Sequence, residues 1–510
     1  MDSELTKIDR WNSELLDVHT WSNHPEIKAL TDKLYVEVDV NTLDKSGNKK
    51  PKTSAKDSLR VLLLDLYVKW LKDPNVSIGF SKAERDYIVG SRYNGLFISP
   101  NIIKIETMLH DAGYTEELPH YHNNKNSDLS YTTRIRHTEK LRSEFKQLTI
   151  DLHDIDTHSN EECIILHDKF VDVPDDNKTK KIKYDDNDLT RTLRDQLQAY
   201  NALLKRSFID IPTFEKPILK RHITKGKSAG QTRTVSLSAD NKFVKRVFNG
   251  GMAGNWELGG RFYGGWWQQI DKGLRPSIYI NDKPTLEIDF KALHPNLLAN
   301  EAGEELSDDP YDLGGLLLPE VLTTSETQRK YVKLLVLMAI NADSDKKAFR
   351  ALRNKDRTDK LGQSLTDEQQ SVLLRKFIEL NPQLEESLNT GQALRLMGID
   401  GKVANMVLDH FTKAGVPVLC IHDSFIIQYD KEHELNTIMD RATKQLTRSY
   451  IKVDIKNDQN VHNARVPYES DHHERSNIEI KLPIFLPPTE QYKLRREKFN
   501  KWLSTKDTSC

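Results

Sequence analysis

Hydrophobic residues form two short runs around residues 422–424, in the stretch VLCIHDSFIIQ. Runs of this length on either side of His422, Asp423 and Ser424 predict a buried β-hairpin with a polar tip. A buried carboxylate without a partner costs free energy. We therefore expect the charge of Asp423 to be compensated, and a bound metal ion is the first candidate.

A second strand pattern, TLEIDF, contains another acidic residue near its end. It predicts a strand through Leu286 and Ile288 that delivers Asp289, with a helix from about Pro295. Two aspartates that meet on one sheet can hold two Mg²⁺ ions about 3.5 to 4 Å apart, and Mn²⁺ is the alternative ion. Because a single strand-end Asp is more often a helix N-cap, the predicted metal centre depends on Asp289 and Asp423 together.

The N-terminal part has helical apolar spacing in two segments, 57–71 and 99–114, followed by extended runs within 114–138 around the turn-rich NNKNSD. Two helices followed by a β-wing that carries Arg134 and Arg136 resemble a winged-helix DNA-binding domain, in which the wing touches phosphates. The alternative is a small α+β packing domain with a solvated hairpin.

The middle of the chain is rich in basic residues. Two extended runs between residues 160 and 185 precede an amphipathic helix, whose apolar face is expected to consist of Leu189, Leu193, Leu197, Tyr200 and Leu204. From Lys216 to Arg246 there are nine basic residues, Arg233 among them, and one acidic residue. Such a run is most often a solvated face, but it lies directly before the richest motifs and therefore favours a track for a phosphate backbone.

The helical pattern ETQRKYVKLLVLMAINA places Arg329 and Lys333 one turn apart on the same face. Two cations at this spacing repel each other unless a negative group lies against them, and a nucleoside triphosphate would supply that charge. In isolation, two solvated basic residues at the start of an apolar helix are the simpler interpretation.

The segment NWELGGRFYGGWWQQI surrounds Arg261 with glycines and aromatic residues. Glycines permit close backbone approach, and an arginine beside Tyr263, Trp266 and Trp267 can contact a phosphate while the rings offer stacking faces. The alternative, an aromatic corner of the core with Gly-rich turns, explains the tryptophans but gives no reason for Arg261.

Composition narrows the class of protein only in part. The 510 residues allow about two to four domains, and 75 basic against 76 acidic residues identify no partner by net charge. Three distant cysteines form no zinc or disulfide spacing. The N-terminus lacks the apolar core of a signal peptide, and the longest apolar run, at 334–340, is too short to cross a bilayer. We expect a soluble, cytoplasmic protein with no membrane contact; the oligomeric state stays open.

The order of these motifs resembles the polymerase palm shared by family A DNA polymerases and the single-subunit RNA polymerases of bacteriophages and mitochondria. Residues 257–261 are similar to the Asp-x-x-Gly-Arg motif of the RNA polymerases, with Glu in place of Asp. Asp289 fits motif A, and the spacing of Arg329 and Lys333 matches the motif B pair. Residues 422–425 resemble motif C in its RNA polymerase form.

The match covers roughly residues 220–450. It implies an α+β fold with a right-hand polymerase palm and fingers, preceded by a largely helical, winged-helix-like nucleic-acid-binding region. The expected divisions of the chain are an N-terminal region, a basic connecting region, the palm with fingers and a C-terminal extension, at 1–150, 151–250, 251–470 and 471–510.

The resemblance also implies roles for individual residues. Asp289 and Asp423 would bind the catalytic metals, His422 the primer end, and Arg329 with Lys333 the incoming triphosphate. Arg261 would contact the template or hybrid backbone. The basic run and the wing add further expected nucleic-acid contacts, at Arg233, Arg134 and Arg136.

Two departures from the family concern recognition of the sugar. The motif B helix of the family ends in Tyr-Gly, whereas this chain has Asn341-Ala342. The motif A glutamate that excludes the 2′-hydroxyl in DNA polymerases is replaced by His294. We expect His294 and Asn341 at the substrate, but they form no recognisable sugar gate. Whether the product is DNA or RNA therefore stays open. The motifs slightly favour an enzyme that, like the RNA polymerases, uses ribonucleotides, or one that discriminates little between the two sugars.

The sequence thus predicts a nucleotidyltransferase that adds nucleoside triphosphates to a 3′-hydroxyl on a DNA or RNA template with Mg²⁺. The alternative is a non-catalytic DNA-binding replication or regulatory protein with a degenerate palm. A nuclease is disfavoured, because hydrolysis has no triphosphate for Arg329 and Lys333 to hold. No set of spaced carboxylates indicates a proofreading exonuclease.

Overall fold

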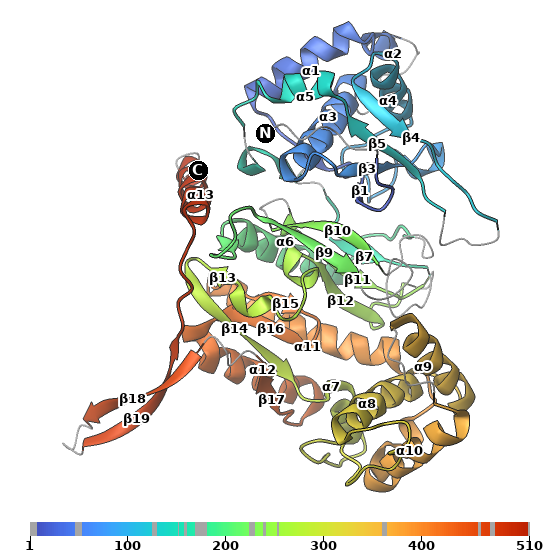
Figure 1. The fold of residues 1–510 in the computed structure, drawn as a ribbon, viewed down its shortest axis with the longest axis vertical. Coiled ribbons are helices and arrows are strands. Elements are labelled where there is room, and N and C mark those ends of the chain that lie inside the picture. Colours follow the sequence, from blue (N-terminus) through green and yellow to red (C-terminus); the bar gives the residue numbers. More distant parts are fainter. Residues whose placement is uncertain are drawn as a thin grey trace.

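Two large hydrophobic cores organise the described residues, one built from residues 27 to 155 and the other from residues 163 to 451, and a small third cluster joins Phe208 to Tyr492 and Phe499. Both combine helices with strands, so the fold is α+β (Figure 1). The computed structural model describes residues 8–45, 54–124, 130–150, 152–157, 161–168, 181–223, 230–237, 241–251, 254–359, 365–456, 461–469 and 475–507, with the side chains of 45, 156–157, 356–359, 461–469, 475–483 and 507 left out.

The N-terminal unit, residues 8–157, packs helices against a four-stranded sheet of order β1-β3-β5-β4. Its elements are β1 (Ser13–Leu15), β2 (Thr20–Trp21), α1 (Pro25–Glu37), α2 (Asn41–Lys45), α3 (Ala55–Lys72), β3 (Ser77–Phe80), α4 (Asn101–Asp111), β4 (Thr115–Leu118), β5 (Thr133–His137), α5 (Glu139–Phe145) and β6 (Asp156–Thr157). Helix α3 is buried over most of its length, because its LRVLLLDLYV segment is apolar on nearly every face.

The predicted N-terminal hairpin is observed, but in a larger sheet than expected. β4 and β5 pair antiparallel, with Thr115 opposite His137. β3 pairs with the other edge of β5, and β1 adds a fourth strand parallel to β3. The sequence analysis missed β1 and β3, which are too short to show a period of two. Part of the expected turn, at 125–129, lies outside the described residues.

The main unit, residues 161–456, contains a central sheet of order β15-β16-β14-β13-β8, in which β17 also pairs with β14. A three-stranded sheet of order β12-β11-β7 and a two-stranded ribbon of β9 and β10 accompany it. The strands are β7 (Ile164–Leu166), β8 (Ile209–Asp210), β9 (Ile218–Ile223), β10 (Gln231–Ser236), β11 (Val244–Phe248), β12 (Gly259–Gly264), β13 (Tyr279–Ile280), β14 (Lys283–Phe290), β15 (Leu419–Ile421), β16 (Ser424–Gln428) and β17 (Val453–Ile455).

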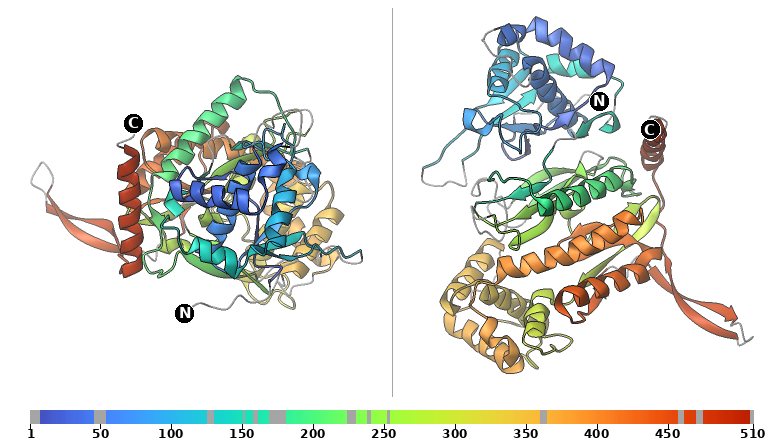
Figure 2. Two further views of the ribbon diagram at one scale, coloured as in Figure 1. Left: turned by 90° about the horizontal axis from the view of Figure 1, so that it is seen from above. Right: turned by 180° about the vertical axis from the view of Figure 1, so that it is seen from behind.

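Helices cover these sheets and extend the main unit to one side. They are α6 (Asp188–Lys205), α7 (Leu293–Glu301), α8 (Ser325–Asn341), α9 (Asp345–Asp359), α10 (Asp367–Leu380), α11 (Ala393–Lys413) and α12 (Glu432–Thr447). The long helix α11 packs against β12, α6 and α12. Helices α8, α9 and α10 contact one another and gather at the end of the main unit farthest from the N-terminal unit (Figure 2).

Helix α6 begins where the sequence pattern places it, at a capping box formed by Asn187 and Thr190. Four of the five apolar residues expected on its inner face are buried, whereas Leu189 is 47% exposed. Leu189 lies in the first turn, before the helix reaches the core. Of the two extended runs expected before this helix, the structure describes β7, and the turn between them, at 173–177, lies outside the described residues.

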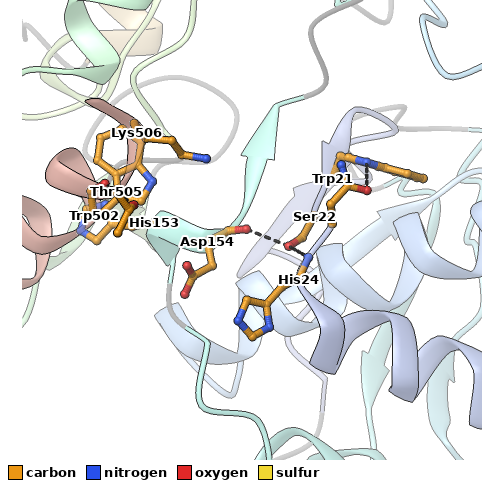
Figure 3. A pocket seen from close by; sticks show the side chains of 9 residues that line it. Trp21, Ser22, His24, His153, Asp154, Trp502, Thr505 and Lys506 are labelled. Atoms are coloured by element: carbon orange, nitrogen blue, oxygen red, sulfur yellow. Dashed lines mark hydrogen bonds between the residues drawn. The ribbon is translucent and has the colours of Figure 1, made fainter. Parts of the chain in front are cut away.

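The C-terminal part leaves the main unit as the ribbon β18 (Val461–Glu469) and β19 (Arg475–Pro483), which projects from the body, and helix α13 (Glu490–Asp507) (Figures 1 and 2). A cavity of about 290 Å³ separates the end of α13 from the N-terminal unit, with Trp21, His153 and Trp502 among its lining residues (Figure 3). Among the described residues, no helix combines the length and apolar character needed to cross a bilayer.

Candidate active site

Asp289 and Asp423 lie on neighbouring strands of the central sheet. β14 and β16 are antiparallel, with Asp289 opposite Ser424. The predicted hairpin of β15 and β16 is present, and Ile421 pairs with Ser424 across a two-residue turn of His422 and Asp423. His422 adopts the left-handed conformation, φ 58°, that such a turn requires and that His tolerates better than most residues. The sheet therefore brings the two aspartates side by side from distant parts of the chain.

The two carboxylates influence each other electrostatically. Burial and the charge of Asp423 raise the pKa of Asp289 to about 6, although an ion pair with Lys456 opposes this shift. That ion pair uses only Oδ2 of Asp289. The other oxygen, Oδ1, is buried and has no hydrogen-bond partner among the described residues. A buried oxygen in this state is costly, and a cation between the two aspartates would satisfy it.

These two aspartates fit Mg²⁺ better than a metal held entirely by protein. No group of three or more His, Cys, Asp or Glu side chains suited to a metal ion is found in the described part of the chain. Mg²⁺ in nucleotide-dependent enzymes is typically held by one or two carboxylates together with substrate phosphates and water. Asp289 and Asp423 match that donor set, and the unpartnered Oδ1 of Asp289 is the atom that a bound ion would satisfy.

We expect Mg²⁺ to raise the thermal stability of the wild-type protein without any nucleotide. At about ten times its Kd, an ion that binds only the folded state adds about 1.4 kcal/mol to the free energy of unfolding. Scanning calorimetry with and without Mg²⁺ measures the shift, which should vanish in the double variant Asp289→Asn, Asp423→Asn. The exposed Asp188 provides a control, since Asp188→Asn should keep the full shift. A shift that survives the double variant would place the ion elsewhere.

Beneath the hairpin, Asp400 of α11 holds Arg261 and His294. Arg261 Nε lies 2.9 Å from Asp400 Oδ2, and His294 Nε2 lies 3.0 Å from the same oxygen. Asp400 is 2% exposed, and although burial alone would raise its pKa, the hydrogen bond from His294 and the charge of Arg261 lower it. Arg261 and His294 are therefore joined through a buried carboxylate that the sequence analysis missed.

Glycines make this junction possible, because α11 packs backbone to backbone against the Gly-Gly-Arg segment. A Cβ on Gly398 would lie 1.8 Å from the carbonyl oxygen of Glu257, and one on Gly401 would lie 2.5 Å from that of Gly260. No larger residue fits at either position without moving the helix. The close approach brings Asp400 within reach of Arg261 in β12.

His422, at the hairpin turn, is half-buried beside Tyr263, whose ring lies 5.3 Å from it in an edge-to-face arrangement. Burial and the positive charge of Arg261 lower the pKa of His422. Its Nδ1 is buried and accepts or donates no hydrogen bond among the described residues. His422 therefore carries a neutral imidazole next to Asp423 at neutral pH, with one ring nitrogen available.

Arg329 and Lys333 of α8 face a tyrosine that the sequence analysis did not single out. The Arg329 guanidinium carbon and the Lys333 ammonium nitrogen each lie 5.9 Å from the centre of the Tyr311 ring. Burial and the charges of Asp309 and Asp423 raise the pKa of Tyr311, so the phenol stays protonated at neutral pH. Tyr311 is therefore near both cations and is also close enough to Asp423 to sense its charge. Arg329 also pairs with Asp309.

Asn341, the last residue of α8, lies at the other end of that helix. Its side-chain Oδ1 is buried and has no hydrogen-bond partner among the described residues. The segment just before α11 packs against this end, with the backbone N–H of Asn389 donating to the carbonyl of Ala339 and that of Gln392 to the carbonyl of Ile340. Asn341 is therefore held at a capped helix end, separate from the cations at the start of α8.

The two wing arginines differ in exposure. Arg136 is 1% exposed, and its guanidinium pairs with Glu116 on the adjacent strand. In this conformation Arg136 therefore lies away from the surface where a phosphate would bind, because a buried cation needs a local partner and Glu116 supplies it. Arg134 is half-buried and donates to the backbone carbonyls of Arg10 and Thr132.

The basic run also divides into structural and exposed residues. Lys242 is buried and donates to the carbonyl of Ser207, and Arg246 is buried and donates to the carbonyls of Gly260 and Gly401. The charge count from Lys216 to Arg246 therefore overstates the surface available to a phosphate backbone. The ribbon of β9 and β10 keeps an exposed or half-exposed basic set, namely Lys220, Arg221 and Arg233.

Comparisons with known proteins identify no family. No family model matches the chain, and no curated protein matches it. Among solved structures, the POL domain of Pol1 from M. smegmatis, in complex with DNA primer-template and dNTP, matches with 12% identity and a TM-score of 0.26. The match covers 38% of this chain and 45% of that chain, so this chain spans less than half of its length.

Proposed function

We propose that the chain is a template-directed nucleic-acid polymerase that adds nucleoside triphosphates to a 3′-hydroxyl. The observation that supports this most directly is the pairing of Asp289 and Asp423 on adjacent strands, with Oδ1 of Asp289 buried and unpartnered among the described residues. Such a pair suits the cations that accompany a triphosphate.

The residues around the aspartates support transfer of a nucleotide more than hydrolysis. Arg329 and Lys333 both lie 5.9 Å from the centre of the ring of Tyr311, which senses the charge of Asp423, and in this proposal they supply positive charge to the β- and γ-phosphates of a substrate. The reaction forms a bond from the 3′-oxygen to the α-phosphorus and breaks the bond to the pyrophosphate that leaves. Bound Mg²⁺ would supply activation of the 3′-hydroxyl and stabilisation of the leaving oxygen.

The other candidate residues position the nucleic acid and the sugar in this proposal. His422 stands beside the aspartates as a neutral donor or acceptor for the primer end. Arg261 and His294, which both contact Asp400, are the polar side chains near the aspartates in this proposal. Exposed Arg233 on the β9 and β10 ribbon is a backbone contact for the template. Asn341 has no role that its surroundings specify.

Extension of a labelled primer on DNA and RNA templates tests this function. Ribonucleotides and deoxynucleotides are supplied separately, with and without primer. A polymerase lengthens the strand only with triphosphates and Mg²⁺. A pure nucleic-acid-binding protein with a degenerate palm shifts the template without lengthening anything, and a nuclease shortens it, so either outcome would replace the proposal.

Loss of the Lys333 ammonium should weaken binding of the triphosphate more than binding of the primer-template. A charge-assisted hydrogen bond is worth about 1.5 to 3 kcal/mol, so we expect Lys333→Ala to raise the KM for triphosphates by about 10- to 150-fold. Lys330, on the same helix, is 70% exposed and pairs with Glu326, so Lys330→Ala should leave KM unchanged. Steady-state extension and primer-template binding measure the two effects. Equal KM values for both variants would show that Lys333 does not contact the triphosphate.

A further inference from the structure

Five residues at the edge of the N-terminal unit form a compact group of rings and guanidinium groups: Arg10, Trp11, Tyr121, Tyr131 and Arg134. The guanidinium carbon of Arg10 lies 4.7 Å from the centre of the Trp11 ring and 5.8 Å from that of Tyr131. Arg134 lies 5.7 Å from the same Tyr131 ring. We call this group the Tyr131 cluster.

The aromatic faces of the cluster are open to solvent in part. Tyr121 and Tyr131 form an isolated backbone bridge between the extensions of β4 and β5, and their rings lie 5.9 Å apart at a tilt of 32°. Tyr121 is 45% exposed, and Tyr131 and Trp11 are half-buried. The bridge pairs the two tyrosines through their backbones, which lowers the entropy cost of presenting them together to a ligand.

The two arginines have no carboxylate partner among the described residues. Arg134 donates from Nε to the carbonyl of Arg10 and from one terminal nitrogen to the carbonyl of Thr132. A guanidinium has five N–H groups, so others remain available to a ligand. Most other arginines of the N-terminal unit are paired, as Arg136 is with Glu116 and Arg142 with Glu139. Two arginines without a carboxylate partner, beside one exposed and two half-buried aromatic rings, suit a ligand that carries negative charge and has flat faces.

The cluster also continues toward the main unit. Asn12, the residue after Trp11, accepts a hydrogen bond from Thr234 of β10, 3.1 Å away. Thr234 follows exposed Arg233 on the ribbon. A strand that contacts Arg10 and Arg134 can therefore pass directly to the basic ribbon.

We propose that the Tyr131 cluster binds single-stranded nucleic acid, with bases stacked on the rings of Tyr121, Tyr131 and Trp11 and phosphates paired with Arg10 and Arg134. Bases within a duplex cover one another's faces, whereas unpaired bases offer them. The inference rests on the proposed polymerase function. It assigns to that function a binding site for the unpaired template strand.

Binding of a fluorescently labelled 20-mer of deoxythymidine, followed by anisotropy at low and high salt, tests this site. Stacking on one ring is worth about 10-fold in affinity, so the double variant Tyr121→Ala, Tyr131→Ala should bind about 10- to 100-fold more weakly. A blunt duplex of the same length should lose less than about 2-fold in affinity, because it has no free bases to stack.

Tyr35 supplies a matched control within the same unit. The Lys56 ammonium lies 5.6 Å from the centre of the Tyr35 ring, a distance similar to those of the arginines in the Tyr131 cluster. Unlike those arginines, Lys56 forms an ion pair with a carboxylate, that of Asp32. Tyr35→Ala should bind the 20-mer like wild type. Because Tyr121 is exposed, the single variant Tyr121→Ala retains the fold and should show about a 10-fold loss on its own.

Asp423→Asn separates this inference from the proposed function, since a variant without polymerase activity should bind the 20-mer with wild-type affinity. Weak binding by wild type at low salt, unchanged binding by the tyrosine variants, or an equal loss for the duplex would each overturn the proposal. Absence of strand extension by wild type, with the expected pattern of binding, would overturn only the polymerase function.

Discussion

Replacing Asp423 with Asn is expected to reduce Mg²⁺-dependent nucleotide incorporation by about 10³-fold or more while leaving the fold intact. Asn keeps the shape of the side chain but loses the charge that would hold the ion, and metal catalysis supplies several kcal/mol to this class of reaction. The Asp423 side chain makes no hydrogen bond or ion pair among the described residues, and its neighbours are positioned by backbone pairing of β15 and β16. Single-turnover primer extension and thermal unfolding measure the two effects.

Asp430 offers a control for this variant on the same sheet. It follows β16 and pairs with Lys283, 2.6 Å away, at the surface. Asp430→Asn should therefore extend primers at the wild-type rate, because exposed ion pairs contribute little to stability and this one lies away from the hairpin turn. If Asp423→Asn extends primers at the same rate as Asp430→Asn and the wild type, the aspartate pair does not take part in catalysis.

The local features of the candidate site could be predicted because they rest on short-range patterns. Apolar runs on both sides of His422 and Asp423 leave only a tight turn between them, and the structure has that turn. The TLEIDF pattern likewise ends within one residue of the observed end of β14, at Phe290. Helix α8 covers the expected segment, with Arg329 and Lys333 on the face toward Tyr311. Each of these follows from period and turn chemistry alone.

The partners of those residues could not be predicted, because they come from distant parts of the chain. Asp400 lies in the middle of an apolar helix, where a lone carboxylate gives no periodic signal. Its role depends on close packing of α11 against β12, which the sequence does not encode locally. Lys456 lies beside Asp289 only because β17 pairs with β14. Tyr311 belongs to a loop whose path is set by tertiary packing.

Basic residues were the least predictable class, because counting charges does not distinguish exposed from buried side chains. Arg136 follows Ile135 in β5 and so points to the opposite face of the sheet, yet both residues are buried, Arg136 against Glu116. Arg246 is surrounded by backbone carbonyls that replace water around its guanidinium. Arg233 on the ribbon stays exposed. The difference arises from which sheet face is covered, and neither charge nor period along the chain records that.

Loss of the Asp400 carboxylate is expected to cost a large part of the stability of the fold. Its carboxylate faces the buried guanidinium of Arg261, and its charge also acts on Arg246, which is 3% exposed. Removing the carboxylate would take away the buried anion that pairs with Arg261 and whose charge acts on Arg246. Because the pKa of Asp400 is lowered in the folded state, its stabilising effect is present above the ordinary Asp pKa of 3.8 and is lost as pH falls through the lowered value.

We expect Asp400→Ala to lower the free energy of unfolding by about 3 to 5 kcal/mol, the usual cost of breaking a buried ion pair on one side. Asp409, on the same helix, pairs with the exposed Lys413, so Asp409→Ala should cost less than about 1 kcal/mol. Denaturant titration at neutral pH measures both. The double variant Asp400→Ala, Arg261→Met should recover part of the loss, because it removes the unpaired cation as well as the anion. Equal costs for Asp400→Ala and Asp409→Ala would show that the Arg261 guanidinium is solvated rather than held by this carboxylate.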